Sequence, residues 1–425
     1  MRIGVIADDF TGASDIAGFL VEGGLKTIMY NGIPKEAPPI EIDAMVISLK
    51  IRSCPVNQAV NEALASLAFL QEAGCTKFYY KYCSTFDSTH EGNIGPVVDA
   101  LMDALCTEQT IICPALPVNG RTVCHGYLFV GFDLLSDSSM RHHPITPMKD
   151  SKLARLMEGQ FKGSTDHIYY PTISAGVEAV KTALLRSKKE HHRYVVVDTL
   201  TDADLVVIAS ATDDMVLVTG GSGLAIGITS VLNAFKGDTV REGSAFIPVA
   251  QRSVVLSGSC SKQTNLQVAA YKVLAPSRRI EEEAALHAPF DHASELASWV
   301  LANGNSKLAP MLYATKTPEE LEESRRRYGD SNVAAAIERV ISLVVQLLFE
   351  AGIRTYIVAG GETSGVVATT LGLESYLIGP QIDPGVSWLK ALHSDLQFSF
   401  KSGNFGNIDF FAKAQRMCVQ GGVNA

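Results

Sequence analysis

Short apolar runs with the composition of β-strands alternate along most of this chain with segments whose apolar residues recur at helical spacing. Residues 3–7 read as a buried strand, and from Val56 to Leu70 apolar residues recur every three or four positions until Gly74. Such alternation is typical of α/β folds, in which helices cover sheets of mostly parallel strands. The pattern therefore predicts α/β architecture with mostly parallel sheets flanked by helices.

The same pattern locates further elements. Strands are predicted at 44–49, 78–81, 110–113, 194–198, 205–209, 216–219, 253–256 and 355–359. Helices are predicted over 14–22 and over 333–348, the second ended by Gly352. Thr317, Pro318 and Glu320 have the order of a helix start, with a cap, a first-turn proline and a capping-box acid.

The length of 425 residues exceeds what one hydrophobic core usually supports, which predicts two domains. Residues 236–250 are polar and contain two glycines and a proline, as a linker does. The strand pattern restarts after them. We therefore expect a first domain at 1–235, a linker at 236–250 and a second domain at 251–425.

Composition excludes several classes of protein. The net charge of −9 argues against general nucleic-acid binding, which needs a basic face. The eight cysteines form no CxxC pair and there is no HExxH motif, which disfavours a structural zinc or a zincin.

The N-terminal apolar stretch is too short for a signal peptide and leads into Asp8 and Asp9. The run Val340–Phe349 is too short to span a bilayer. We expect a cytoplasmic protein with reduced thiols and no membrane or nucleic-acid partner; assembly with identical chains stays open.

The first chemically informative loop is Asp8-Asp9-Phe10-Thr11-Gly12-Ala13, at the exit of the first predicted strand. In open α/β sheets, ligands collect beyond the carboxyl ends of the strands. Two carboxylates followed by Thr-Gly at a helix start offer hydroxyl acceptors, a general base and free N–H groups. The alternative is a helix cap with one solvent-facing acid. We predict Asp9 as the base, with Asp8 as its substitute.

Cations, hydroxyls and amides follow several successive strands of the first half. Arg52 and Arg121 can each grip a carboxylate through two hydrogen bonds, and Lys81 adds a third cation. The accompanying polar residues are Ser84, Thr85, Asn119 and Gly120. Each residue alone reads more simply as a surface residue. Their recurrence at strand ends predicts a pocket for a polyhydroxylated acid.

Glycine-rich loops follow strands of the second half. The first is Ser257, Gly258 and Ser259; the second is Gly360, Gly361, Glu362 and Thr363, continuing to Gly365; the third is 401–406, with Gly403 at its centre. Glycine lets a backbone approach a phosphate, and a helix N-terminus supplies aligned N–H donors. The alternative is that these are only tight turns. We favour a site for the phosphates of ATP with Mg²⁺, whose protein ligands the sequence leaves unknown.

Two familiar nucleotide motifs are missing. No GxxxxGK[ST] occurs, so the chain is not a Walker-type NTPase. Gly221, Gly223 and Gly227 approximate a dinucleotide fingerprint but are spaced one residue too far apart. A dehydrogenase is therefore disfavoured.

Seven motifs in order resemble the four-carbon acid sugar kinase family. They are DDFTGA at 8–13, KYCSTFDS at 81–88, CPALPVNGRT at 113–122, HPITPM at 143–148, VLSGSCS at 255–261, GGETSG at 360–365 and KSGNFG at 401–406. Within that family the chain is most similar to kinases that phosphorylate the C4 hydroxyl of 3-oxo-tetronates. The resemblance implies an N-terminal domain for the sugar acid and a C-terminal domain for ATP. It also implies nucleotide contacts at Ser257, at 360–363 and at Gly403.

We therefore expect an ATP-dependent kinase that converts 3-oxo-tetronate to its 4-phosphate in a cleft between the domains. Threonate or erythronate kinase of the same family is the alternative. From another class, a non-catalytic sugar-acid sensor would bind the acid without ATP turnover, but would leave the glycine loops without a purpose.

Overall fold

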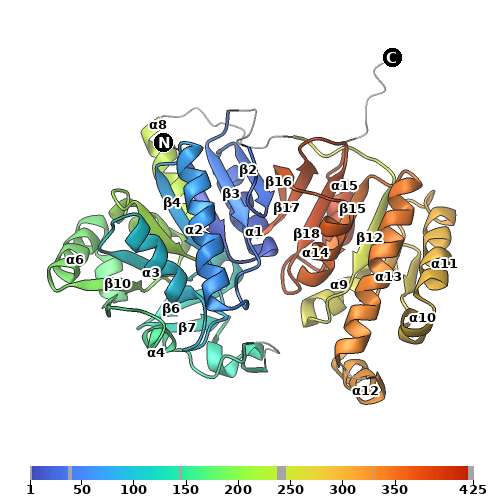
Figure 1. Cartoon of the computed structure of the whole chain (residues 1–425), viewed down its shortest axis with the longest axis horizontal. Coiled ribbons are helices and arrows are strands. Elements are labelled where there is room, and N and C mark those ends of the chain that lie inside the picture. Colours follow the sequence, from blue (N-terminus) through green and yellow to red (C-terminus); the bar gives the residue numbers. More distant parts are fainter. Residues whose placement is uncertain (1, 37–40, 143–145, 237–245, 329, 420–425) are drawn as a thin grey trace. The chain divides into compact units, whose positions relative to one another are not determined.

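The computed structural model describes residues 2–36, 41–142, 146–236, 246–328 and 330–419. The chain divides into two compact units, Met1–Ser244 and Ala245–Ala425. Figure 1 shows both, coloured along the sequence. Most of the predicted linker at 236–250, namely 237–245, lies outside the described residues, and so do the first three residues of the motif at 143–148. Each unit has the predicted α/β form, and each is described by itself below.

Unit 1 is built on a parallel sheet. In spatial order its strands are β2 (Thr27–Asn31), β3 (Ala44–Ser48), β1 (Ile3–Ala7), β4 (Lys77–Lys81), β11 (Leu217–Gly220), β5 (Thr110–Cys113), β10 (His192–Val197) and β9 (Ser164–Ile168). All the neighbouring pairs among them are parallel. The central strand β1 is buried along its whole length. This burial explains why it reads as a continuous apolar run instead of an alternating one.

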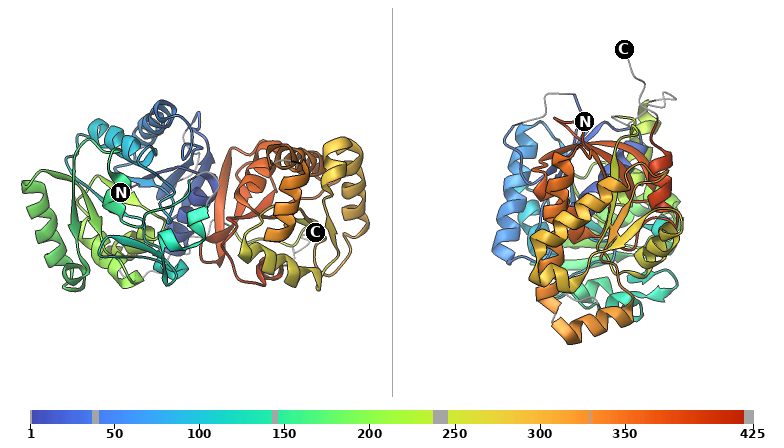
Figure 2. Two further views of the ribbon diagram at one scale, coloured as in Figure 1. Left: turned by 90° about the horizontal axis from the view of Figure 1, so that it is seen from below. Right: turned by 90° about the vertical axis from the view of Figure 1, so that its right-hand side faces the viewer.

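Helices cover both faces of this sheet (Figure 2). One face carries α2 (Val56–Glu72) and α3 (Ile94–Ala104), and the other carries α1 (Phe10–Glu22), α6 (Val177–Lys189), α7 (Asp202–Ala211) and α8 (Leu224–Lys236). The short helices are α4 (Leu153–Met157), α5 (Tyr170–Ser174) and the 3₁₀ turns η1 (Pro117–Asn119), η2 (Leu135–Asp137) and η3 (Ser139–His142). A separate antiparallel sheet contains β6 (Arg121–Cys124), β7 (Tyr127–Val130) and β8 (Asp133–Leu134).

One predicted strand is wrong. Residues 205–209 lie inside helix α7, which begins with a capping box between Thr201 and Asp204. The run Leu205–Ala209 is apolar because Leu205 and Ile208 pack into the core. A short apolar run of this kind does not separate a buried helix from a buried strand. The capping residues just before the run were the missed signal.

Unit 2 is built on a mixed sheet. In spatial order its strands are β13 (Ser277–Arg279), β14 (Met311–Tyr313), β12 (Ser253–Ser257), β15 (Thr355–Ala359), β18 (Gln397–Lys401), β17 (Val386–Ala391) and β16 (Ser375–Asp383). The pairs from β13 to β18 are parallel, whereas β17 runs antiparallel to both of its neighbours, β18 and β16. The strands β12 and β15 have the predicted positions.

The helices of unit 2 are α9 (Lys262–Lys272), α10 (Glu282–His287), α11 (Pro289–Ala302), α12 (Pro318–Tyr328), α13 (Asp330–Glu350), α14 (Gly361–Thr370) and α15 (Phe410–Arg416). The predicted capping box of α12 is present, because Thr317 N–H donates to Glu320 and Glu320 N–H donates to the Thr317 hydroxyl. The apolar core includes Ile357, Trp388 and Phe410.

The segment Asn332–Glu350 of α13 is long and apolar enough to cross a membrane by length and composition. It packs against α10, α11 and α14. Val340, Val344 and Leu348 on this helix are fully buried. A core helix of a globular unit passes the same test, so the segment is weak grounds for a membrane span.

Candidate functional site

In unit 1, three loops meet at the carboxyl ends of the adjacent strands β3, β1 and β4. Backbone hydrogen bonds join them: Asp8 N–H donates to the Lys81 carbonyl (3.0 Å), and Ile51 N–H donates to the Asp8 carbonyl (3.1 Å). The last residue of β1, Ala7, is in register with Lys81 of β4. Because parallel strands end at one edge of a sheet, the side chains after them come together there. The predicted residues Asp8, Arg52 and Lys81 therefore lie side by side.

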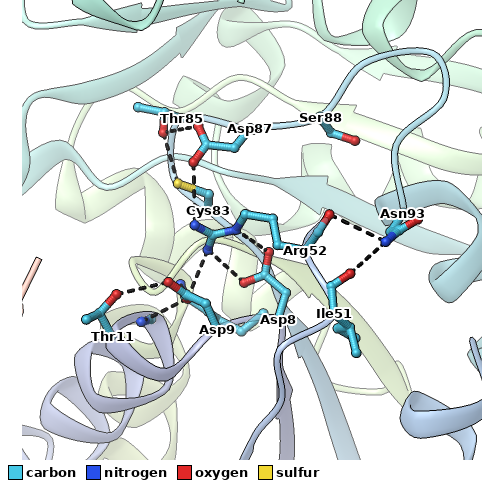
Figure 3. Close-up of polar contacts among 12 residues, drawn as sticks. Asp8, Asp9, Thr11, Ile51, Arg52, Cys83, Thr85, Asp87, Ser88 and Asn93 are labelled. Carbon is cyan, nitrogen blue, oxygen red and sulfur yellow. Dashed lines mark hydrogen bonds and ion pairs between the residues drawn. The ribbon is translucent and has the colours of Figure 1, made fainter. Parts of the chain in front are cut away.

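Arg52 lies at the centre of this cluster (Figure 3). Its Nε and Nη2 donate to the two carboxylate oxygens of Asp8, at 2.8 and 2.9 Å. Its Nη2 also lies 2.9 Å from Oδ1 of Asp9, and its Nη1 lies 3.5 Å from Oδ2 of Asp87. Asn93 fixes the backbone beside it by donating to the Ile51 carbonyl at 2.7 Å. Arg52 therefore has carboxylate partners of its own and holds the three aspartates in place.

The two adjacent aspartates differ in their environment. Burial raises the pKa of Asp8, although the paired guanidinium of Arg52 opposes the rise. Burial also acts on Asp9, but the charges of Arg52 and Lys81 together outweigh it and lower the pKa of that carboxyl. Asp9 is also the N-cap of α1, since its oxygens accept from Gly12 N–H (3.0 Å) and the Thr11 hydroxyl (2.9 Å). Asp9 is consequently the predicted helix cap as well as a member of the cluster.

Lys81, unlike Arg52, has hydrogen-bond donors that the cluster does not satisfy. Its side chain is 4% exposed, and its Nζ lies 3.8 Å from Oδ1 of Asp9, which is beyond hydrogen-bond distance. Within the residues that the structure describes, this ammonium donates no hydrogen bond. It lies against the backbone of Gly12, where a Cβ atom would be 1.9 Å from Nζ. Glycine at position 12 therefore makes room for the ammonium at the start of α1.

The other predicted residues of the first half surround this cluster. Thr85 donates to Asp87 at 2.7 Å, and Ser84 is buried beside it in the same loop. Asn119 and Gly120 form the end of η1, where Arg121 donates through Nη1 to the Asn119 carbonyl. The Nδ2 atom of Asn119 is buried, and within the described part of the chain it has no hydrogen-bond partner. An amide donor therefore remains for a ligand.

In unit 2, the three glycine-rich loops meet at the carboxyl ends of β12, β15 and β18, which are neighbours in the sheet. Gly258 N–H donates to the Ala359 carbonyl at 3.0 Å, and Gly360 N–H donates to the Lys401 carbonyl at 2.9 Å. The Ser261 hydroxyl donates to the Gly403 carbonyl at 2.6 Å. All the predicted residues of this group, from Ser257 to Ser259, from Gly360 to Thr363, and Gly403, lie at one edge.

The helix α14 starts at the centre of these loops. Its N-cap Gly360 has φ of 122°, which a side chain disfavours, and lies beside Ser259. Gly361, Glu362 and Thr363 form the first turn, whose N–H groups have no intrahelical acceptors. Such a turn favours an anion.

Lys401 stabilises the third loop through hydrogen bonds to its backbone. It is fully buried, and its Nζ donates to the Thr264 hydroxyl and to the carbonyls of Ser402 and Gly403, each at 3.0 Å. No carboxylate among the described residues pairs with it, and burial lowers its pKa to about 7. The Gly403 carbonyl is thus turned inward, toward α9.

The sequence prediction missed one acidic residue at the edge of unit 1. Asp15 of α1 is buried and accepts a hydrogen bond from the hydroxyl of Ser222, which follows β11. Burial raises the pKa of Asp15 to about 6. The position of Asp15, one helical turn beyond the loop at residues 8–13, could have drawn attention to it. Its partner Ser222 lies more than 200 residues away in sequence, so the sequence does not show that the two residues meet.

A group of three residues with the spacing of metal ligands lies elsewhere in unit 1. Ligand atoms of Asp166, Glu190 and His192 are all within 4.8 Å of one another. Glu190 is exposed, and exposed acidic groups are common without a metal. This group is remote in the sheet from the cluster around Arg52, since β9 is the strand at the far edge.

Each half of the chain matches the model of a known protein family. A family model described as a sugar-binding N-terminal domain matches residues 3–228, and one described as a nucleotide-binding C-terminal domain matches residues 254–411. Together they cover most of the chain. Their boundaries fall on either side of the polar segment at 236–250.

Individual proteins are similar over the whole length. A 3-oxo-tetronate kinase of Brucella melitensis is 49% identical over 423 residues, covering 99% of this chain and 97% of its own. A 3-oxo-tetronate kinase of Pectobacterium atrosepticum is 50% identical over 419 residues, covering 98% and 99%. Among solved structures, a Salmonella typhimurium protein described as a tRNA synthase has a TM-score of 0.90 at 50% identity, covering 98% of this chain and 99% of its own.

Proposed function

Because this chain belongs to the family that pairs a sugar-binding N-terminal domain with a nucleotide-binding C-terminal domain, we propose that it is an ATP-dependent sugar-acid kinase. The substrate we propose is a 3-oxo-tetronate, phosphorylated on its C4 hydroxyl to give the 4-phosphate. The names of the whole-length relatives support this choice. Threonate and erythronate are the competing acids.

The observation that carries the proposal is the buried ammonium of Lys81. A cation that is 4% exposed, with a carboxylate only at 3.8 Å, has donors left for a second anion. A substrate carboxylate supplies that anion and the missing hydrogen bonds. In the proposal Lys81 and Arg121 bind the carboxylate, the amide of Asn119 binds a hydroxyl or carbonyl oxygen, and Arg52 keeps the aspartates positioned.

The nucleotide is assigned to unit 2. Its phosphates would accept from the first-turn N–H groups of α14 and from the hydroxyls of Ser257 and Ser259, while glycines allow the backbone to approach. Mg²⁺ needs only one or two protein carboxylates, since phosphates and water supply its other ligands. Glu362 is exposed in the first turn of α14 and offers one such carboxylate.

Each unit then holds one substrate, and transfer requires the γ-phosphate of one to contact the hydroxyl of the other. Catalysis of phosphoryl transfer consists mainly of positioning and charge neutralisation.

An assay of ADP release with 3-oxo-tetronate, threonate and erythronate, each with and without Mg²⁺, tests the function. We expect Mg²⁺-dependent release with the highest kcat/KM for 3-oxo-tetronate. A higher value for threonate or erythronate would reassign the substrate within the family. Binding of an acid by calorimetry with no ADP release from any acid would instead indicate a sensor and contradict the kinase.

A matched pair of variants tests the carboxylate anchor. Lys77 and Lys81 are buried lysines at opposite ends of β4, and Lys77 donates to the backbone carbonyls of Thr212 and Asp213. We expect Lys81→Met to raise the KM for the acid well over tenfold, because a lost buried charge contact costs about 2–5 kcal/mol. Lys77→Met should leave KM unchanged. Equal effects of both variants would place the carboxylate elsewhere.

A further inference from the structure

Asp15 carries an unused carboxylate oxygen inside unit 1. The residue is 3% exposed, and one of its oxygens accepts from the Ser222 hydroxyl. Its Oδ1 is buried and has no hydrogen-bond partner within the described part of the chain. A buried acceptor that is left unsatisfied destabilises the folded state. A ligand that donates a hydrogen bond to this oxygen would explain why it has no partner in the protein.

The surroundings place Asp15 at the substrate edge and not in the general core. Gly12 and Asp15 are three residues apart on α1 and so share a helix face, and Lys81 Nζ lies against Gly12. Ser222 follows β11, whose last residue, Gly220, is in register with Lys81. The charged groups that act on Asp15 are Lys81 from β4, Arg121 from β6 and Asp9 from the start of α1.

Three of the aspartates at this edge, Asp8, Asp9 and Asp15, differ in what their oxygens do. Both oxygens of Asp8 pair with Arg52. Those of Asp9 accept from a helix N–H and a hydroxyl and also face two cations. Only Asp15, of these three, keeps an oxygen without a partner. A base must reach the proton it removes and works best with a pKa near the working pH. The pKa of Asp15 is about 6, whereas that of Asp9 is lowered.

We propose that Asp15 is the general base of the phosphoryl transfer, a role that rests on the function proposed above. Its Oδ1 accepts the proton of the acceptor hydroxyl while that oxygen forms a bond to the γ-phosphorus. The bond from the γ-phosphorus to the bridging oxygen breaks, and ADP leaves with the bonding electrons. Ser222 fixes the carboxylate, and Asp9 caps α1 and holds Lys81 and Arg52.

Three isosteric variants test the assignment in the full-length enzyme with ATP, Mg²⁺ and the preferred acid. Asp15→Asn should lower kcat by about 10²- to 10⁴-fold, the usual contribution of a general base, with both KM values within threefold. Asp9→Asn should act on the KM for the acid more than on kcat. The control is Asp99→Asn, since Asp99 is also a buried aspartate with a raised pKa but pairs with Tyr194 on the far side of the sheet.

The pH profile separates chemistry from structure. The kcat/KM of the wild-type enzyme for the acid should fall as pH drops below about 6, where Asp15 of the free enzyme becomes protonated, and Asp15→Asn should lack this limb. Ser222→Ala removes a donor that lowers the pKa of Asp15, so its limb should move to higher pH with kcat otherwise retained.

The outcomes are distinct. If wild-type enzyme releases ADP and Asp15→Asn keeps kcat within threefold, Asp15 is not the base. A loss of 10²-fold or more in Asp9→Asn alone would return that role to Asp9. If wild-type enzyme releases no ADP with any acid, the proposed function fails, and the role of Asp15 fails with it.

Discussion

Both units have their candidate site at the carboxyl ends of the sheet strands, but the chemical groups that form the two sites differ. At the carboxyl edge of unit 1 the groups are charged side chains, with Arg52 between Asp8, Asp9 and Asp87. At the carboxyl edge of unit 2 they are backbone N–H groups, glycines and hydroxyls. Lys401, a buried charge of that edge, faces its own backbone. The contrast is between recognition by side chains and recognition by backbone.

The difference follows from what each edge is proposed to bind. A small acid offers a carboxylate and hydroxyls whose positions vary between related acids, so side chains must distinguish them. Phosphates are alike in every nucleotide, and the start of a helix with glycines suffices for them. Unit 1 should therefore respond strongly to the loss of a charge, and unit 2 to changes of backbone conformation.

The largest effect should come from Arg52→Ala. The variant leaves the carboxylate of Asp8 buried without its bidentate partner, and breaking a buried pair costs about 3–5 kcal/mol of folding free energy. Because Arg52 is 24% exposed, we expect the low end, about 3 kcal/mol, in urea unfolding of the full chain. The double variant Arg52→Ala/Asp8→Asn should recover much of the loss. No recovery would show that Arg52 acts through packing alone.

Asp15 gives the next largest effect, in the opposite direction. Its pKa is about 6 in the folded chain against 3.8 for the ordinary group, so the folded state keeps a proton that the unfolded state releases between pH 4 and 6. Folded wild-type protein therefore loses stability as pH rises through this range. Asp15→Asn should be more stable than wild type by about 2–3 kcal/mol above pH 6, because each pKa unit is worth about 1.4 kcal/mol.

Urea unfolding at pH 4 and pH 8 checks this linkage. The advantage of Asp15→Asn should shrink to below about 1 kcal/mol at pH 4, where the folded wild type is protonated at this residue and the unfolded chain is about half protonated. An advantage that does not change with pH would contradict the linkage. Stability gained and turnover lost in one variant is the expected mark of a functional carboxyl.

In unit 2 the sensitive feature is the backbone at Gly360. Its φ of 122° lies in a region that costs a residue with a side chain about 1–3 kcal/mol, and an added Cβ would lie 3.1 Å from the Ser259 nitrogen. We expect Gly360→Ala to weaken binding of a non-hydrolysable ATP analogue about tenfold by calorimetry, equal to about 1.4 kcal/mol. Gly365→Ala in the same helix is the control, since its Cβ meets no atom within 4 Å. Unchanged affinity in both would move the nucleotide away from α14.

The smallest effect should come from Lys401→Met. Its hydrogen bonds are to hydroxyls and carbonyls, and the Gly403 carbonyl keeps Ser261 and Thr264 as donors after the change. Burial already disfavours the ammonium, so its removal should offset the lost hydrogen bonds, and any loss of unfolding free energy at pH 7 should stay below about 1 kcal/mol. A loss as large as that of Arg52→Ala would abolish the contrast between the units.

The fold and the convergence of the loops could be predicted because both follow from order along the chain. Strand ends carry Asp8, Arg52 and Lys81, and a parallel sheet brings its strand ends to one edge. The same reasoning brought the three loops of unit 2 together. These predictions needed no side-chain geometry.

The parts that escaped prediction depend on contacts between distant segments. Asp15 reads as an ordinary helix residue until Ser222 and the glycine at position 12 place it beside Lys81. The pairing of Arg52 with Asp8, in place of a ligand, is a matter of distances that no spacing in the sequence encodes. The apolar run in α7 was misread because periodicity is ambiguous over five residues.

The burial of Lys401 couples the folding of unit 2 to the solvent's protons. With a pKa of about 7 when folded and about 10.4 when unfolded, this amine holds a proton at pH 8.5 only in the unfolded chain. Folding at that pH releases close to one proton per chain, and unfolding takes it up again from the buffer. The heat of unfolding should therefore differ between Tris, which gives up its proton with a large heat, and phosphate, which does so with a small one. Between wild type and Lys401→Met, this dependence on the buffer should differ by the ionisation heat of about one proton.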